Sequence, residues 1–405
     1  MRRALRQSQG KPDHWDRKHE RGRPRLHWLV LCLLLLGLVG SVKSAFSQSK
    51  PTEREAHERR VLREQSFLRG RSSPGAVGAA QRYRAYLQKM RMRTSGLARA
   101  QNVEGDSSPS SVVVWSPLGP APLASDASGV GEYDYGWVSG RATAVAIDPA
   151  DPTGNTLYIG GAYGGVWKST NATQAVTKTS SSVIWTALID NQPTLAVGAI
   201  AIQPGNTNAS NSLILVGTGE TNSSADSYYG LGILRSPDAG ATWTLIPSDT
   251  SGTRSFAGMG FSKIAFSSSS PNLALAATAG AAEGIIEGLA DPLTANLGLY
   301  YSEDSGNSWN YANVSDSTVT TAPGSASSVV YNAGTGQFFA ALRYHGFYSS
   351  SDGIHWTRMA SQPGGGLSAS ACPANPSSSS CPIYRGEIAV VPGRKEMYAW
   401  YQRPS

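Results

Sequence analysis

One short pattern recurs four times in this chain: a serine, then an acidic or amide residue two positions later, a tight turn, and a tryptophan. The regular copies read Ser-Pro-Asp-Ala-Gly-Ala-Thr-Trp over 236–243 and Ser-Glu-Asp-Ser-Gly-Asn-Ser-Trp over 302–309. The copy over 350–356 is one residue shorter, and the first copy has Asn171 for the aspartate and reaches Trp185 only after a polar insertion. We call each copy a box turn. Because repeats outweigh local propensity in indicating a fold, these turns constrain the architecture most strongly.

Apolar runs that alternate like β-strands surround the box turns in sets of four. The expected strands are 142–147, 156–160, 166–169 and 183–188; 197–202, 213–217, 232–236 and 242–246; 262–266, 273–278, 298–302 and 308–311; and 328–331, 338–342, 346–350 and 355–359. Runs at 387–391 and 396–400 match the first two strands of a fifth unit, and 114–118 matches a fourth strand. The sequence therefore predicts an all-β fold: a β-propeller of four-stranded antiparallel blades over 112–405, with four blades and part of a fifth, incomplete in this chain.

The residues of the box turns are predicted to be structural. The aspartate accepts backbone N–H bonds across the turn, the glycine supplies a positive φ, and the tryptophan covers the neighbouring apolar layer. The structural set is Ser236, Asp238, Gly240, Trp243, Ser302, Asp304, Gly306, Trp309, Ser350, Asp352, Gly353 and Trp356.

The charge of the chain is unevenly distributed. Residues 1–100 contain 23 Lys and Arg against 7 Asp and Glu, whereas residues 101–405 contain 12 against 21. A nucleic-acid-binding surface needs basic residues clustered on a folded face, so the acidic repeat region predicts no nucleic-acid partner.

An apolar run at 26–42 follows a basic n-region of cytoplasmic type at 1–25. Small residues at Ala45 and Ser47 favour a signal peptide over 26–47, cleaved before Gln48. The long basic n-region favours an uncleaved membrane anchor instead. Both readings predict an exported protein, either secreted or in the periplasm or cell envelope.

Residues 48–111 are predicted to be a basic spacer and linker. Stretches at 52–62 and 79–92 have helical spacing, and an interfacial helix on anionic lipid is the alternative to a solvated spacer. Membrane contact is therefore expected only through 26–42 and, in that alternative, through the spacer.

Two cysteines, Cys372 and Cys381, bracket a short loop. In an oxidising compartment they predict a disulfide, and two unpaired thiols are the alternative. No second Cys/His pair accompanies them, so no zinc site is predicted. No metal or other cofactor is predicted, and calcium at the acidic loops has no support in the pattern.

The box turn resembles the Asp-box, or bacterial neuraminidase repeat, of sialidase-like and sortilin-like β-propellers. The resemblance implies that the box turns lie on the face away from the ligand site. The segment from Ser139-Gly140-Arg141 to Trp167-Lys168-Ser169 is similar to the opening blade of xyloglucan-hydrolysing glycosidases, which carries a catalytic aspartate just before a Gly-Gly pair. Here the matching position, before Tyr163-Gly164-Gly165, is Ala162, and the Arg-Ile-Pro motif of sialidases is also missing. Both departures count against hydrolysis.

Binding residues are expected in the loops that join the second to the third strand and in those that join the fourth strand to the next unit, because long loops on a rigid scaffold carry function. The loops of the second and third units are the longest. Carboxylates there could form the acid/base couple of a glycosidase, and the candidate catalytic residues are Glu220, Glu283 and Glu287. The candidate ligand-binding residues are Asp226, Tyr228, Tyr229, Arg254, Asp291, Arg343 and His345.

Three functions remain open at this point. The first is an exported module that binds an extracellular glycan or protein without catalysis. The second is a glycoside hydrolase, sialidase-like or xyloglucanase-like, acting on extracellular polysaccharide. The third is a structural scaffold of the cell envelope.

Overall fold

The computed structural model describes residues 62, 85–94, 123–124, 137–138, 140–176, 183–222, 227–281, 294–316, 319–320, 324–363 and 382–403. The chain divides into two compact units, Met1–Arg63 and Glu64–Ser405. Only Leu62 is described in the first unit, so the account below concerns the second. Several predicted features lie outside the described residues. They are the apolar run at 26–42, the isolated strand at 114–118, and the cysteines Cys372 and Cys381.

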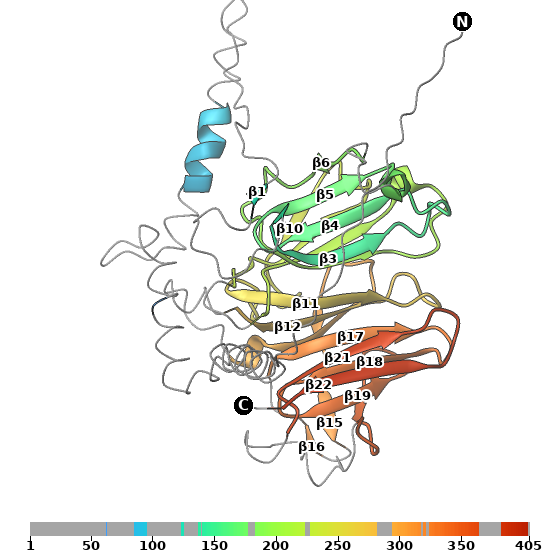
Figure 1. Ribbon diagram of the computed structural model, residues 1–405. Coiled ribbons are helices and arrows are strands. Elements are labelled where there is room, and N and C mark those ends of the chain that lie inside the picture. Colours follow the sequence, from blue (N-terminus) through green and yellow to red (C-terminus); the bar gives the residue numbers. More distant parts are fainter. Residues whose placement is uncertain are drawn as a thin grey trace, which may run out of the picture. The chain divides into compact units, whose positions relative to one another are not determined.

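The second unit is built from four-stranded antiparallel sheets that follow one another in chain order (Figure 1). The first sheet contains β3 (Ala142–Ile147), β4 (Leu157–Gly161), β5 (Gly165–Ser169) and β6 (Thr186–Ala187). The second contains β7 (Val197–Ile202), β8 (Ile214–Thr218), β9 (Ile233–Ser236) and β10 (Thr244–Ile246). The third contains β11 (Met259–Phe266), β12 (Ala274–Gly280), β13 (Gly298–Ser302) and β14 (Asn310–Tyr311). The fourth contains β17 (Ala326–Asn332), β18 (Gln337–Leu342), β19 (Gly346–Ser350) and β20 (Trp356–Arg358), and the pair β21 (Arg385–Val390) and β22 (Met397–Gln402) follows.

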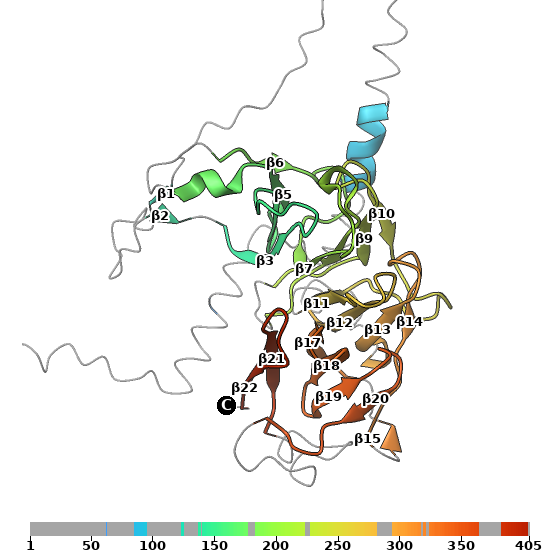
Figure 2. The same cartoon turned by 90° about the vertical axis from the view of Figure 1, so that its right-hand side faces the viewer.

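This topology confirms the predicted all-β fold of four-stranded antiparallel blades. In each sheet the strands pair in chain order, and the first strands of successive sheets lie next to one another. Figure 2 shows the succession from β3 (green) to β21 and β22 (dark red). The fourth strands are shorter than predicted, because the box turn occupies part of the expected run before each of them.

Several smaller elements accompany the sheets. They are a helix over 85–94, the two-stranded pair β1 (Leu123–Ala124) and β2 (Trp137–Val138), and the 3₁₀ turns η1 (Ala172–Val176), η2 (Ala209–Asn211) and η3 (Thr294–Asn296). The pair β15 (Val314–Asp316) and β16 (Val319–Thr320) extends the fourth sheet, with β15 parallel to β20. The sequence reading missed this extension. Among the described residues, no helix is both long and apolar enough to span a bilayer.

The core lies between the sheets, as layers of apolar side chains. One cross-strand row in each sheet faces the preceding sheet: Ile200–Val216–Leu234, Ile264–Ala276–Tyr300 and Val329–Ala340–Tyr348. Most of these side chains are fully buried. The same register in the first sheet gives Val145–Ile159–Trp167, and there Val145 is 62% exposed. The first sheet therefore exposes an apolar face of the kind that is buried between sheets elsewhere in the fold.

A β-bulge occurs at the same place in the first strand of all four sheets. The bulged residues are Thr143, Gly198, Ser262 and Ser327. Their hydroxyl groups donate to the first strand of the next sheet: Thr143 to the Val197 carbonyl at 2.6 Å, Ser262 to Ala326 at 2.9 Å, and Ser327 to Gly386 at 2.7 Å. Gly198 has no hydroxyl, and a Cβ there would lie 2.2 Å from the Phe261 carbonyl oxygen. The bulges thus join each sheet to the next, by a hydrogen bond or by direct backbone contact.

The box turns have the predicted internal bonds. Asp238 Oδ1 accepts from the Thr242 amide at 2.8 Å, and its Oδ2 accepts from the Thr242 hydroxyl at 2.6 Å. Ser236 Oγ accepts from the Gly240 amide at 2.8 Å. Equivalent bonds form around Asp304 and Asp352. In the first copy Asn171 Oδ1 accepts from the Ile184 amide at 2.9 Å, so the turn closes across its insertion.

The glycine of each of the last three box turns lies close to a leucine of the preceding unit. Gly240 and Gly306 have φ values of +94° and +81°, a conformation that favours glycine. A Cβ on Gly240 would lie 2.6 Å from Leu188, and one on Gly306 would lie 2.5 Å from Leu215. The turn therefore requires glycine both for its backbone and for this close approach.

Candidate functional site

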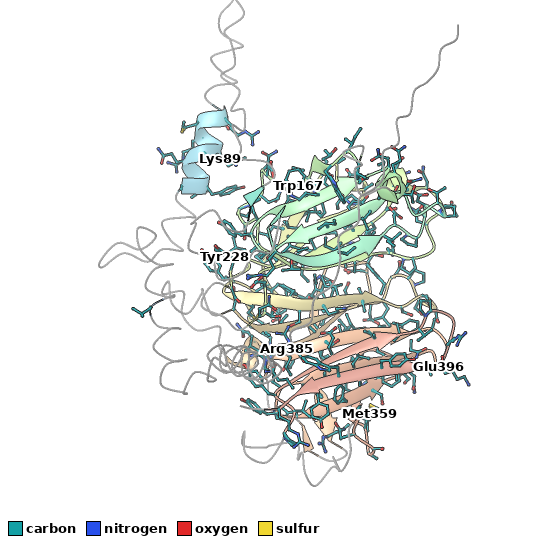
Figure 3. The ribbon with its side chains drawn as sticks, in the orientation of Figure 1. Lys89, Trp167, Tyr228, Met359, Arg385 and Glu396 are labelled. Atoms are coloured by element: carbon teal, nitrogen blue, oxygen red, sulfur yellow. The ribbon has the colours of Figure 1, made fainter. Side chains whose placement is uncertain are left out.

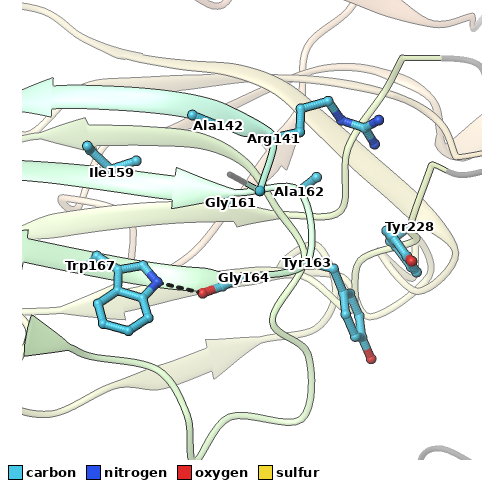
Figure 4. A pocket seen from close by; sticks show the side chains of 10 residues that line it. Arg141, Ala142, Ile159, Gly161, Ala162, Tyr163, Gly164, Trp167 and Tyr228 are labelled. Atoms are coloured by element: carbon cyan, nitrogen blue, oxygen red, sulfur yellow. Dashed lines mark hydrogen bonds between the residues drawn. The ribbon is translucent and has the colours of Figure 1, made fainter. Parts of the chain in front are cut away.

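Two adjoining cavities lie where the loops after the second strands meet the starts of the first strands. The first, which we call the aromatic cavity, has a volume of about 550 Å³ (Figure 4). Its lining residues are Gly140, Arg141, Ala142, Ile159, Gly161, Ala162, Tyr163, Gly164, Trp167 and Tyr228. They come from the start of β3 and the two residues before it, and from β4, β5 and the tight turn between them. Tyr228 comes from the β8–β9 loop of the second sheet.

Tyr163 and Tyr228 form a stacked pair in the aromatic cavity, with ring centroids 4.3 Å apart and planes inclined by 25° (Figure 4). Tyr163 is 43% exposed, so its ring is accessible to a ligand. Gly165, at the end of the turn, has a φ of +76°. This left-handed conformation reverses the chain direction, so Tyr163 lies at the tip of the turn. Trp167 lies farther along the same sheet face, and its Nε1 donates to the Gly164 carbonyl at 2.8 Å, which fixes the indole.

The second cavity, which we call the polar cavity, has a volume of about 280 Å³. Its lining residues are Ala142, Thr143, Gly198, Glu220, Thr221, Asn222, Ser262, Lys263, Arg385 and Glu387. Ala142 lines both cavities, so they adjoin at this residue. Three of the lining residues are bulged residues of first strands: Thr143, Gly198 and Ser262. The contacts by which the bulges join neighbouring sheets therefore form part of the cavity wall.

Arg141 and Glu220 connect the two cavities. Arg141 Nη2 donates to Glu220 Oε1 at 2.7 Å and its Nε donates to Oε2 at 3.1 Å, a bidentate ion pair between the first and second sheets. The Glu220 residue is 1% exposed, whereas the Arg141 side chain is 41% exposed. Bidentate geometry fixes the orientation of a guanidinium, so the buried carboxylate holds Arg141 at the aromatic cavity.

The other charged groups of the polar cavity come from the third and fifth sheets. Lys263 Nζ lies 3.3 Å from Glu387 Oε1, which also accepts from the Ser328 hydroxyl at 3.1 Å. Arg385, at the start of β21, donates through Nη1 to the Thr221 carbonyl at 3.4 Å (Figure 3). Side chains from four sheets therefore meet in one small polar space.

Of the residues predicted from sequence, Tyr228 lies in the aromatic cavity and Glu220 in the polar cavity. Tyr229 instead packs against Ala281 and Leu231. The roles proposed for these residues in binding or catalysis stay predictions.

Three further predicted residues have structural contacts of their own. Arg254 pairs with Asp249 at 3.8 Å and lies over the Tyr311 ring, 4.4 Å from its centroid. Arg343 is partly buried, with its guanidinium 5.1 Å from the Tyr384 centroid. His345 is buried and its carbonyl accepts from Arg358 Nε at 2.9 Å.

The other predicted site residues lie outside the described residues. They are Glu283, Glu287, Asp226 and Asp291. Ala162, the position where the glycosidase resemblance would place a catalytic aspartate, lines the aromatic cavity.

Sequence reasoning missed Tyr163, Trp167, Lys263, Arg385 and Glu387 as site residues. A tyrosine between glycines in a tight turn was a usable signal for Tyr163. The charged residues gave no such signal, because their partners are far apart in sequence: Arg141 and Glu220 are separated by 79 residues and Lys263 and Glu387 by 124.

No protein-family model matches the chain, and no curated protein matches it. Solved structures with a similar fold include an ancestral GH74 enzyme, which is 23% identical with a TM-score of 0.45, over 71% of this chain and 29% of that one. The GH74 xyloglucanase from Xanthomonas campestris is 20% identical with a TM-score of 0.35, over 56% of this chain and 31% of that one. YCF48 from Cyanidioschyzon merolae is 13% identical with a TM-score of 0.33, over 63% and 61%. The chain spans less than a third of the two GH74 proteins, and these likenesses concern the fold alone.

Proposed function

We propose that this chain binds an extracellular glycan at the aromatic and polar cavities without hydrolysing it. The observation that carries the proposal is the stacked pair Tyr163–Tyr228 beside the fixed ion pair Arg141–Glu220. Ligand sites combine mostly apolar walls with a few well-placed polar groups, and cavities of about 300–1,000 Å³ are typical. An exposed tyrosine ring offers a flat apolar surface to one face of a pyranose, and Arg141 offers hydrogen bonds to its hydroxyl groups.

The two aromatic rings support each other for this role. Stacked rings contribute about 0.5–1.5 kcal/mol beyond their area burial. Tyr228 therefore holds Tyr163 in place before a ligand arrives, which reduces the entropy lost on binding. The contact also joins loops of two sheets, so the binding surface depends on the assembled fold rather than on one loop.

Glycoside hydrolysis is the second candidate, favoured by the presence of two carboxylates, Glu220 and Glu387, in the polar cavity. A glycosidase needs one carboxyl group that carries a proton for the leaving oxygen. Here each carboxylate is already bound to a cation, Glu220 to Arg141 and Glu387 to Lys263. Among the described lining residues, the arrangement therefore supports binding better than catalysis.

A glycan array with product analysis by mass spectrometry tests the proposal. We expect retention of at least one glycan class without released sugar, and loss of about tenfold in affinity for Tyr163→Ala, the equivalent of about 1.4 kcal/mol. Tyr398→Ala is the matched control, because Tyr398 is an exposed tyrosine of β22 outside both cavities.

Three outcomes would change the conclusion. Released sugar would establish the hydrolase. Binding that Tyr163→Ala leaves unchanged would place the site elsewhere. An array without any bound glycan would favour a protein partner or a scaffold role.

A further inference from the structure

The charges around the polar cavity are unequal in the described part of the chain. Its two carboxylates are each paired, Glu220 with Arg141 at 2.7 Å and Glu387 with Lys263 at 3.3 Å. Arg385 also lines the cavity but forms no ion pair with a described carboxylate. Its Nη1 donates a hydrogen bond to a neutral group, the Thr221 carbonyl, at 3.4 Å. With Arg141 counted from the adjoining aromatic cavity, three described cations face two carboxylates, and one guanidinium charge is left over.

A second cation lies close to Arg385. Burial lowers the pKa of the Arg343 guanidinium, and the positive charge of Arg385 lowers it further. Arg343 is positioned by its ring contact with Tyr384, the residue directly before Arg385. The two arginines repel each other, and an anion bound at Arg385 would relieve this repulsion.

We propose that the polar cavity binds the carboxylate of an acidic sugar, with Arg385 as its anchor. This inference rests on the proposed function and names its ligand class: glycans that contain hexuronic acid. A guanidinium presents two parallel N–H groups that match the two oxygens of a carboxylate.

The neighbouring cavity explains why the anion should belong to a sugar. Both cavities are lined by Ala142, so an oligosaccharide that covers the Tyr163 ring can extend toward the cavity that holds Arg385. Asn222, whose Nδ2 lies 3.4 Å from Glu220 Oε1, is an amide donor in the same wall.

The experiment measures affinities for hexuronate-containing oligosaccharides and for the same oligosaccharides after reduction of their carboxyl groups. We expect the acidic form to bind at least tenfold more tightly at low salt, and the preference to decrease as sodium chloride is added, because salt screens the interaction. Arg385→Gln should remove the preference, so that the acidic and the reduced forms bind with similar affinity. Arg385→Lys should retain part of it, because the charge remains but the bidentate geometry is lost.

Arg394→Gln is the matched control, since Arg394 belongs to the turn of the same β-hairpin, is exposed and pairs with Glu396 at 3.3 Å. It should bind as the wild type does, and thermal unfolding should show that all variants are folded. Equal affinity for acidic and reduced forms in the wild type would overturn the inference and leave glycan binding intact. A preference that survives Arg385→Gln would overturn Arg385 as the anchor, and tighter binding of sulfated than of carboxylated sugars would overturn the ligand class. Failure to bind either form, or any other glycan on the array, would instead refute the proposed function.

Discussion

The hydroxyl group of Thr143 donates a hydrogen bond to the carbonyl oxygen of Val197, 2.6 Å away in the first strand of the next sheet. Thr143 is the bulged residue of β3, and the bulge turns its side chain toward β7. The bond joins the first and second sheets beside the polar cavity, so the fold and the candidate site share it.

Removing the Thr143 hydroxyl should weaken the contact between the first and second sheets. Thr143→Val keeps the shape but leaves the Val197 carbonyl without its donor, and we expect a loss of about 1 kcal/mol in the free energy of unfolding. Urea denaturation measures it. Thr244→Val, at an exposed position of β10, should change stability by less than half as much. Equal losses in the two variants would show that the inter-sheet bond contributes nothing specific.

The open face of the first sheet allows a matched comparison of two valines. Val329 and Val145 hold the same register position, but Val329 is fully buried against the third sheet whereas Val145 is 62% exposed. Val329→Ala should cost about 2 kcal/mol, because apolar contacts are lost and a small cavity forms. Val145→Ala should stay within about 0.5 kcal/mol. A large loss from Val145→Ala, measured by chemical denaturation of the chain at low concentration, would mean that this face is covered in solution.

Replacing a box-turn glycine by alanine should cost stability in two ways, through an unfavourable backbone conformation and through a clash of the new Cβ. Comparing two glycines separates these two costs. Gly306 and Gly336 both have positive φ, +81° and +67°, but only Gly306 has a neighbour within reach of a Cβ, the Leu215 side chain at 2.5 Å. Gly336→Ala should cost about 1 kcal/mol from strain alone. Gly306→Ala should cost about 3 kcal/mol, since the leucine must also move. Thermal and urea unfolding of the two variants would test the difference, and similar costs would argue against the leucine contact.

The box-turn carboxylates predict a loss of stability in acid. Burial alone would raise the pKa of Asp304, but hydrogen bonds from the Ser308 hydroxyl and amide and from Ser302 hold it below its ordinary value. Hydrogen bonds from Thr242 likewise lower the pKa of Asp238. A carboxyl group whose pKa is lower in the folded state than its unfolded value of about 3.9 contributes stability above that value. This contribution is lost as the pH falls through the folded-state pKa.

We therefore expect the melting temperature of the wild type to fall steadily below about pH 4. Asp304→Asn should melt lower than the wild type at pH 7 and lose less between pH 4 and lower pH, because it lacks one of the titrating groups. Differential scanning fluorimetry across this range provides the curves. Parallel curves for the two proteins would show that Asp304 does not contribute to the acid response.

The sequence predicted the sheets well because two signals agreed over each unit. Alternating apolar residues gave β3 and β7 with their observed bounds, and the box turns fixed where the third strand ends, as at Ser302 and Ser350. The bulges at Thr143 and Ser262 were not predictable, because a bulge depends on how two strands pair. The short β15, parallel to β20, was missed for the same reason.

The candidate site was predicted only in part. Loop position and residue type pointed to Tyr228 and Glu220, which lie in the two cavities. Their partners Tyr163 and Arg141 belong to the first sheet, and only the assembled fold brings them within reach. Arg254 and His345, which were also predicted to bind a ligand, have local contacts with Tyr311 and Arg358, and their role in binding stays a prediction.

The contact between each box-turn glycine and a leucine of the preceding sheet bears on how such a chain can grow during evolution. Such a unit has a leucine that contacts the box-turn glycine of the next unit, and a box-turn glycine that contacts a leucine of the unit before it. It therefore carries one side of the contact at each of its two interfaces. Duplication of such a unit inserts a sheet whose two neighbours already fit it, as the equivalent pairs Leu215–Gly306 and Leu275–Gly353 show. Gly240 contacts a leucine at another position, Leu188, which follows β6. Sheets can thus be gained by copying without new inter-sheet contacts having to arise, while the loops at the other end are left to diverge.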